Sequence, residues 1–398
     1  MKIIYKVVLL LIILYTGIIT AQTVLPETAT PKALNQPLVT PLPPNINATA
    51  YIIIDTDSGK IIAEKNSDQK SPPASLTKMM TLYVISNALH HEQIHLTDNV
   101  RISREAWKAT GSRMFVKEGQ QVSIAKLMRG IIVDSGNDAC VAMAEHLGGS
   151  EQGFADIMNQ QAQALGMTHS HFTDSNGLPD SNHYTTAKDL AILGRALIND
   201  FPQYYHFYKQ KWFTFNDIKQ PNRNRLLWRD AQVDGIKTGH TDEAGFCLIA
   251  SAKRDNMRLM TVILGAPNDT TRTDDSERLL NYGFRFFETY KVYQAQQTIT
   301  QIKIYKGVTD NINVGVLKNK FVTIPTGQYK YLIMKLQTQK NLQAPIEANT
   351  KIGDVLIELN NKVIETYPLY ALNTVQLGGL FQRLTDNIAL AWRNWFHS

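Results

Sequence analysis

The chain has few cysteines, little excess of charge of either sign and, after its N-terminal segment, no apolar run long enough to span a membrane. Its two cysteines, Cys140 and Cys247, are too few for a disulfide framework or a cysteine-ligated metal site. The 41 lysines and arginines are scattered and outnumber the 35 acidic residues only slightly, so nucleic-acid binding is not indicated. A hydrophobic content of 43% and a charged content of 19% exclude wholesale disorder and a polytopic membrane protein.

The first 47 residues predict an export signal followed by an extended spacer. Two lysines precede a short apolar stretch and small residues end it, so residues 1–21 have the features of a cleaved signal peptide. An uncleaved membrane anchor is the alternative, although the stretch is shorter than the roughly twenty residues that a bilayer requires. Six prolines lie within residues 22–44, so the linker, residues 22–47, is expected to avoid helix and sheet.

Residues 48–294 predict one α/β domain with a mostly antiparallel sheet and a helical subdomain. Two apolar runs around D-T-D-S-G-K indicate a hairpin with Gly59 in its turn, and three apolar runs after residue 234 indicate the strands that complete the sheet. Periodic apolar residues predict helices between and after these strands. The expected helical ranges are 74–90, 123–147, 153–165, 186–199 and 273–289.

The rest of the chain predicts a small all-β domain and a terminal helix. Across residues 295–370 short β-rich runs alternate with turn signals and no helical period persists. Residues 376–398 place apolar side chains at three- and four-residue steps and carry two tryptophans near the end. That pattern is typical of an amphipathic helix that binds a membrane surface. A terminal helix packed on its own protein is the alternative.

Three serines precede a lysine by three residues, namely Ser67, Ser75 and Ser123. A helical i, i+3 pair brings both side chains to one face, and the lysine can act as a base where burial lowers its pKa. Ser67 and Lys70 lie in a polar, proline-bound segment, and Ser123 has the features of a helix cap. Ser75 opens the most apolar helix of the chain, with Lys78 one turn inside it, so this pair is the best candidate.

Two later motifs supply further groups suited to acyl transfer. S-G-N at Ser135 to Asn137 holds a hydroxyl and an amide two residues apart, although alone it is more often a polar turn. K-T-G lies in a predicted strand, where Gly239 allows close approach of a ligand to the strand edge and Lys237 and Thr238 supply a cation and a hydroxyl. A solvated lysine beside a turn glycine is the alternative for that tripeptide. The order of the three motifs makes the combination specific.

S-x-x-K, S-x-N and K-T-G in this order are the signature of penicillin-binding proteins and serine β-lactamases. The segments "SLTKMMT", "VDSGNDACVAMAEHLGGS", "VDGIKTGHTDEAGFCLIASAKR" and "LLNYGFRFFETY" resemble the low-molecular-weight D-alanyl-D-alanine carboxypeptidases, from about residue 50 onward. "SNGL" stands where the family usually has "HGL", a departure expected to leave the catalytic groups untouched. The resemblance implies a DD-peptidase/β-lactamase-like fold and a periplasmic enzyme on the outer face of the inner membrane.

The resemblance also implies the chemistry. Ser75 would attack the carbonyl of the penultimate D-Ala of a peptidoglycan stem peptide and form an acyl-enzyme that water hydrolyses, with Lys78 as its base. Ser135 and Lys237 would pass the proton to the leaving amine. β-Lactam antibiotics would acylate the same serine and inhibit the enzyme.

Substrate binding is likewise implied by the resemblance. Asn137 would bind a substrate amide, and the backbone N–H groups of Ser75 and His240 would form the oxyanion hole. Thr238 and Arg272 would hold the terminal carboxylate, because cleaving one C-terminal residue requires a cation placed for it. A further family arginine near the site is matched by Arg223.

Two rival functions are weighed against this hypothesis. A class A β-lactamase requires a deacylating glutamate between S-x-N and K-T-G, whereas the only E-x-x-L-N begins at Glu277, after K-T-G. Only Glu145 and Glu151 lie between the two motifs, in helical and loop settings. A non-catalytic β-lactam sensor or cell-wall binding module is the second rival, but the chain shows no signalling segment joined by membrane spans.

Metal and thiol chemistry are not indicated by the remaining reactive side chains. His183 and His240 lack any paired ligand spacing, so neither a metal nor another cofactor is predicted. Cys140, five residues after Ser135, is expected near the site as a buried packing residue.

Overall fold

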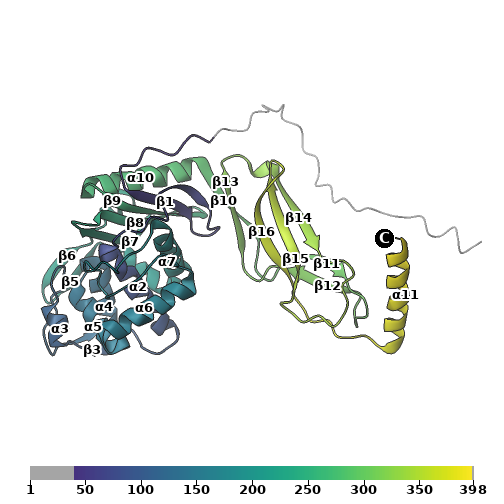
Figure 1. Cartoon of the computed structure of the whole chain (residues 1–398), viewed down its shortest axis with the longest axis horizontal. Coiled ribbons are helices and arrows are strands. Elements are labelled where there is room, and N and C mark those ends of the chain that lie inside the picture. Colours follow the sequence, from purple (N-terminus) through teal and green to yellow (C-terminus); the bar gives the residue numbers. More distant parts are fainter. Residues whose placement is uncertain (1–39, 397–398) are drawn as a thin grey trace, which may run out of the picture. The chain divides into compact units, whose positions relative to one another are not determined.

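The computed structural model describes residues 40–396, without the side chains of residues 393–396. The predicted signal peptide and residues 22–39 of the predicted linker lie outside the described residues. Figure 1 shows the described elements, coloured along the sequence.

A five-stranded antiparallel sheet organises the first part of the chain, with the strand order β2-β1-β9-β8-β7. The first two strands form the predicted hairpin, with Gly59 at a φ of +79° in the connection. Because β1 pairs with β9, the start and the end of the domain meet in the sheet, and β7 is left as an outer strand. The strands are β1 (Ala50–Asp55), β2 (Ile61–Lys65), β7 (Val233–Thr241), β8 (Gly245–Arg254) and β9 (Met257–Ala266).

Helices cover both faces of this sheet (Figure 1). Side chains of β9 alternate between two cores: Met260 and Val262 pack into the helical subdomain, whereas Leu259 and Ile263 pack toward α10. The helices with their bounds are η1 (Ala74–Thr77), α2 (Lys78–His90), α3 (Arg104–Lys108), α4 (Ile124–Arg129), α5 (Asn137–Gly148), α6 (Glu151–Leu165), α7 (Ala187–Asp200), α8 (Pro202–Tyr205), η3 (His206–Lys209), α9 (Leu226–Arg229) and α10 (Asp269–Phe286).

Helix α2 is buried nearly all round, as its apolar composition predicts. Thr186 caps α7 through a hydrogen bond that its hydroxyl accepts from the N–H of Asp189. Two small two-stranded sheets complete the helical subdomain, β3 (Asn99–Arg101) with β4 (Gln121–Ser123) and β5 (Trp212–Phe215) with β6 (Ile218–Pro221).

The single helix predicted over residues 123–147 is wrong, because the chain breaks at the S-G-N motif. After α4 a π-helical turn spans Gly130–Asp134, and Ser135 then adopts left-handed backbone angles, with a φ of +58°. The N–H of Gly136 donates to the carbonyl of Gly130, which closes the turn before α5 begins. Apolar periodicity continued across the break because residues on both sides are buried in the same core.

The helix predicted to reach residue 289 ends at Phe286. Residues 287–293 instead form β10 (Phe287–Tyr293), whose backbone pairs with β13 (Lys320–Pro325). The hydrogen bonds to β13 form only in the folded chain. The periodic pattern of this segment therefore predicted a helix that extends too far.

The remaining strands form a β-rich part with its own core, in which Ile312, Val314, Val355 and Leu369 are fully buried. Its five-stranded sheet has the order β11-β12-β16-β15-β14. The elements are β11 (Thr298–Lys303), β12 (Asn311–Gly315), η4 (Tyr329–Tyr331), β14 (Leu332–Thr338), β15 (Lys351–Leu359) and β16 (Lys362–Ala371).

The terminal helix α11 (Leu380–Phe396) exposes an apolar stripe, as predicted. Leu380 and Phe381 are 82% and 81% exposed, and Leu384, Ile388 and Trp392 continue the stripe. The opposite side of the helix contacts the protein: Asp386 accepts a hydrogen bond from the N–H of Lys306, and Leu390 is buried. Among the described residues no helix combines the length and the apolarity needed to cross a bilayer.

Candidate active site

Ser75 and Lys78 lie together at the start of the buried helix. Ser75 belongs to the 3₁₀ turn η1, and Lys78 is the first residue of α2. The Nζ atom of Lys78 donates to Ser75 Oγ at 2.9 Å, as the i, i+3 spacing predicts. The preceding residue, Ala74, has a φ of +48°, so the turn that presents the serine carries backbone strain of a kind that clusters at functional sites.

Burial makes Lys78 suited to act as a base. Its side chain is fully buried, and its Nζ atom also donates to the backbone carbonyl of Asn176 at 2.6 Å. Burial is the main cause that lowers the pKa of Lys78, and the guanidinium of Arg223 lowers it further, whereas Asp174 and Asp138 oppose the shift. The lowered pKa increases the fraction of neutral amine that can take the proton of Ser75.

A second serine–lysine pair is formed by residues far apart in sequence. The Nζ atom of Lys237 donates to Ser135 Oγ at 3.0 Å and to the carbonyl of Thr238 at 3.0 Å. Burial lowers the pKa of Lys237 well below its ordinary value, and the nearby cation of Lys78 contributes to the same shift. The left-handed conformation of Ser135 therefore places its hydroxyl against the strand that carries K-T-G.

Strand β7 packs directly against the turn that carries Ser75. A Cβ atom at Gly239 would lie 3.2 Å from the carbonyl oxygen of Pro73 and 3.3 Å from the N atom of Leu76. The glycine thus permits contact between strand and turn, as well as leaving the strand edge accessible. His240 follows as an exposed residue whose ring lies 4.0 Å from that of Phe246, and Thr238 is 5% exposed.

Asn137 opens helix α5 directly after the S-G-N break. Its Nδ2 atom donates to the carbonyl of Thr110 at 2.6 Å, which fixes the direction of the amide. Its neighbour Asp138 accepts backbone hydrogen bonds from the segment that begins at Met114. One N–H of Nδ2 is thereby engaged, and the Oδ1 atom of Asn137 can accept a hydrogen bond from a ligand.

Arg272 and Arg223 differ in how the protein uses their guanidinium groups. Arg272 is 6% exposed and donates to Asp269, to the carbonyl of Gly239 and to the carbonyl of Cys247. Arg223 is exposed and makes no hydrogen bond or ion pair with any of the described residues. The structure therefore gives Arg272 a part in joining β7 to β8, a role that the sequence did not predict.

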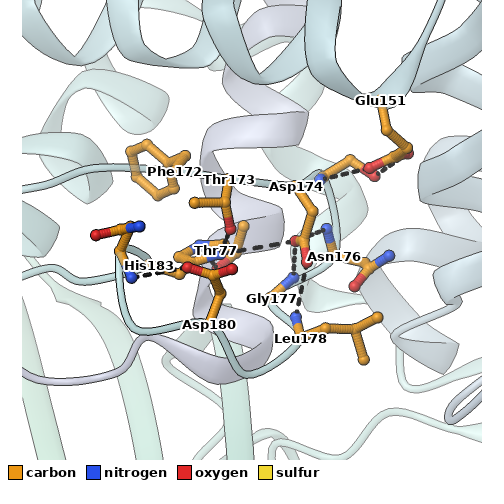
Figure 2. A network of polar contacts seen from close by, with 12 residues as sticks. Thr77, Glu151, Phe172, Thr173, Asp174, Asn176, Gly177, Leu178, Asp180 and His183 are labelled. Atoms are coloured by element: carbon orange, nitrogen blue, oxygen red, sulfur yellow. Dashed lines mark hydrogen bonds and ion pairs between the residues drawn. The ribbon is translucent and has the colours of Figure 1, made fainter.

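A polar loop after helix α6, residues 173–183, contacts the turn η1 through Thr77 (Figure 2) and contacts Lys78 through a backbone carbonyl, and the sequence did not reveal it. Asp174 accepts hydrogen bonds from three successive backbone N–H groups, those of residues 176, 177 and 178. His183 contacts Thr77 Oγ1 at 2.9 Å and Thr173 Oγ1 at 3.0 Å, so its ring bridges the loop to η1. This order directs the carbonyl of Asn176 at Lys78.

Asn176 of "SNGL" contacts Lys78 through its backbone. The departure of this segment from "HGL" concerns side chains, whereas the asparagine carbonyl that accepts a hydrogen bond from Lys78 belongs to the main chain. The contact uses the backbone, and a side-chain motif carries no signal for it. Glu151 supports the same loop by accepting hydrogen bonds from the N–H and the hydroxyl of Ser175.

The family model described as D-alanyl-D-alanine carboxypeptidase matches residues 38–268. The chain belongs to the D-alanyl-D-alanine carboxypeptidase family. A second family model, described as the C-terminal domain of penicillin-binding protein 5, matches residues 287–377. These matches confirm the resemblance seen in the sequence.

Individual relatives agree over most of their length. D-alanyl-D-alanine carboxypeptidase DacC of Escherichia coli is 44% identical over 89% of this chain and 91% of DacC. The crystal structure of penicillin binding protein 5 from Haemophilus influenzae is 44% identical, covers 84% of this chain and 99% of that chain, and gives a TM-score of 0.81. Penicillin-binding protein D2 from Listeria monocytogenes in its ampicillin-bound form is 29% identical over 61% of this chain and all of that chain, with a TM-score of 0.56. The predicted fold class is confirmed.

Two glutamates, Glu151 and Glu277, are engaged away from Ser75. Glu151 holds the loop at Ser175, and Glu277 of helix α10 pairs with Arg229 of helix α9. Within residues 40–396 no carboxylate forms a hydrogen bond with Ser75 or Lys78.

The remaining candidates from the sequence are a second S-x-x-K motif, a cysteine and possible metal ligands. Ser67 donates to Glu64 and Lys70 is exposed above the ring of Tyr184, so that S-x-x-K motif does not form a serine–lysine pair. Cys140 is fully buried, and burial raises its pKa to about 12. The part of the chain that the structure describes contains no cluster of three His, Cys, Asp or Glu side chains able to hold a metal.

Proposed function

We propose that this carboxypeptidase removes the terminal D-Ala of peptidoglycan stem peptides through an acyl-enzyme on Ser75. The observation that carries the proposal is the pair of buried lysines, Lys78 on helix α2 and Lys237 on strand β7, each hydrogen-bonded to a serine hydroxyl. Neutral Lys78 takes the hydroxyl proton as Ser75 Oγ attacks the penultimate D-Ala carbonyl. The bond to the leaving amine then breaks, and Ser135 with Lys237 delivers the proton to the departing nitrogen.

The developing oxyanion is assigned to the backbone N–H groups of Ser75 and His240. Each such donor is typically worth about 3–4 kcal/mol in the transition state. The Oδ1 atom of Asn137 is assigned to a substrate N–H, because the hydrogen bond from Nδ2 to the carbonyl of Thr110 fixes the direction of the amide. Water hydrolyses the acyl-enzyme in the last step and regenerates the free hydroxyl of Ser75.

The terminal carboxylate is assigned to Thr238 and Arg223, with Arg272 in support. Arg223 is exposed and has no partner among the described residues, whereas most N–H groups of Arg272 bind Asp269 and two backbone carbonyls. A guanidinium that is free can bind a carboxylate without breaking existing hydrogen bonds. Arg272 then acts by holding Gly239 and its strand in place.

We also propose that β-lactam antibiotics acylate Ser75 and are released slowly. A β-lactam presents a reactive carbonyl and a carboxylate, like the peptide terminus, and a relative of this chain is known in an ampicillin-bound form. Slow release follows from the absence of a carboxylate hydrogen-bonded to Ser75 or Lys78 within the described residues. Rapid turnover of a penicillin by the purified protein would favour a β-lactamase instead.

The proposed location is the periplasm, with α11 on the surface of the inner membrane. The apolar stripe of α11 points away from the side that contacts the protein at Asp386 and Leu390. An exposed stripe of this kind partitions into the headgroup region of a bilayer. Its orientation disfavours the alternative in which the helix buries its apolar side on its own protein.

The test of the proposed activity uses one protein and two measurements. Intact mass after incubation with a penicillin is expected to rise by one penicillin mass, and D-Ala is expected to be released from a stem pentapeptide. Ser75→Ala should lose both, whereas Ser123→Ala, a serine from another S-x-x-K motif, should keep both. Retention of both by Ser75→Ala would overturn the proposal.

A further inference from the structure

A groove of about 730 Å³ lies next to the proposed carboxylate site. Two tryptophans from different elements form one wall: Trp212 of strand β5 and Trp228 of helix α9. Their ring centroids are 6.0 Å apart at an interplanar angle of 87°. The two side chains remain 46% and 41% exposed, although a tryptophan normally buries most of its surface. Exposed aromatic groups gathered in one groove are typical of a binding surface.

The rest of the groove is polar and carries fixed hydrogen-bonding groups. Arg225 pairs with Asp269 at 2.7 Å, and Arg229 pairs with Asp274 at 2.5 Å. These pairs hold planar guanidinium groups beside the two rings, where their remaining N–H groups can bind hydroxyl or carbonyl oxygens. The rim therefore combines donors and acceptors and is net positive, because Arg225 and Arg272 share Asp269 and Arg223 has no acidic partner among the described residues.

A sugar ring matches this combination. Its C–H groups form an apolar face that stacks on an indole, while its hydroxyl groups point outward at the edge toward planar polar side chains. The lining places two indoles and four arginines in one groove, so a sugar can stack on an indole and accept hydrogen bonds from guanidinium groups. A cationic ligand would instead meet the arginines Arg223, Arg225 and Arg229.

We propose that the groove binds an N-acetylated sugar of a peptidoglycan glycan strand. The inference rests on the proposed function, because it takes the cleaved peptide to be part of a glycan-linked wall. Arg223 and Arg272 line the groove and also flank the site assigned to the terminal carboxylate. A stem peptide joins its own glycan at the opposite end from that carboxylate. The sugar in the groove therefore belongs to a neighbouring strand, and the groove favours assembled wall over isolated peptides.

The first test measures sugar binding directly, with the full chain and a tetramer of N-acetylglucosamine as the probe in calorimetry. Trp212→Ala and Trp228→Ala should each weaken binding by roughly five- to tenfold, the loss expected for one aromatic contact. Trp212→Phe should restore part of it because a ring remains. Trp107→Ala is the matched control, since Trp107 is 42% exposed on α3 and does not line the groove.

The second test separates this inference from the proposed function. Release of D-Ala is measured from a free pentapeptide and from pentapeptide-rich sacculi. The two groove variants should keep the free-peptide kcat/KM within about twofold and lose roughly fivefold on sacculi. Failure of the wild-type chain to cleave the free peptide would overturn the proposed function. The groove assignment alone would be overturned if the wild type cleaved the free peptide while wild type and groove variants cleaved sacculi at equal rates and bound the tetramer with equal affinity.

Discussion

At the scale of single residues, Lys78 and Lys237 have similar surroundings, and each is hydrogen-bonded to a serine hydroxyl. Both are buried, and burial lowers the pKa of each. Lys78 contacts Ser75 within one helical turn, whereas Lys237 reaches Ser135 from a strand about a hundred residues away in sequence. The local pair was predictable from i, i+3 spacing, but the second pair depended on resemblance because sequence alone does not join a strand to a helix break.

Replacing Lys78 by arginine tests its role as a base. The guanidinium stays protonated at any accessible pH, so kcat/KM should fall by roughly 10²- to 10⁴-fold while the positive charge is kept. In the wild type kcat/KM should rise with pH as Lys78 loses its proton. Because the pKa of Lys78 is lowered, that rise should occur below the 10.5 of an ordinary lysine.

The pH profile of D-Ala release supplies the measurement, and Lys126→Arg is the control. Lys126 is the exposed lysine of another S-x-x-K motif, so its replacement should leave both the rate and the profile unchanged. A Lys78→Arg enzyme that kept a tenth of the wild-type kcat/KM would contradict the assignment of Lys78 as base.

At the scale of elements, the loop of residues 173–183 holds the turn that carries Ser75 through close backbone packing. Gly177 has a φ of +87°, and a Cβ atom there would lie 1.9 Å from the carbonyl oxygen of Ala74. No other side chain fits that approach without moving η1. A larger side chain at residue 177 would therefore displace the loop and the turn together. The carbonyl of Asn176, which accepts a hydrogen bond from Lys78, would move with them.

Gly177→Ala should consequently destabilise the protein and slow acylation. The left-handed backbone alone costs about 1–2 kcal/mol for alanine, and the overlap with Ala74 adds about 1–3 kcal/mol of packing strain. Urea unfolding measures the loss of stability, and the rate of penicillin labelling measures the slower acylation.

The matched control for this prediction is Gly166→Ala. Gly166 has a similar φ of +82°, but nothing lies within 4 Å of its added Cβ, so only the backbone cost applies. Equal losses of stability in the two variants, with equal labelling rates, would refute the proposed contact between loop and turn.

Elements with a periodic pattern of their own were predictable, and those set by distant partners were not. The hairpin around Gly59, the buried helix α2 and the three strands after residue 233 follow from local pattern. The break at Ser135 did not, because its apolar neighbours continue the period while tertiary packing selects the left-handed turn. The contact of Asn176 with Lys78 was missed since a backbone carbonyl leaves no mark on residue type.

At the scale of the whole molecule, α11 is the element assigned to membrane attachment. Deleting residues 378–398 should lower binding to anionic lipid vesicles at least tenfold, since the exposed apolar stripe is lost. Release of D-Ala from a soluble pentapeptide should be unchanged. Vesicle flotation is the measurement, and undiminished flotation of the deletion variant would place the attachment elsewhere.

A point-substituted control keeps the helix and its length. Phe381→Gln with Leu384→Gln removes two residues of the stripe and leaves Asp386 and Leu390, on the opposite side, in place. This variant should float poorly while its thermal unfolding stays close to that of the wild type.

The outer position of β7 has a consequence for inhibitor chemistry. Its far side has no strand partner among the described residues, and it runs past both serine–lysine pairs. An extended backbone laid along it would gain main-chain hydrogen bonds that do not depend on side-chain identity. Compounds built as short rigid strands with an electrophilic carbonyl could therefore engage this enzyme without a lactam ring, and single side-chain replacements would remove little of their affinity.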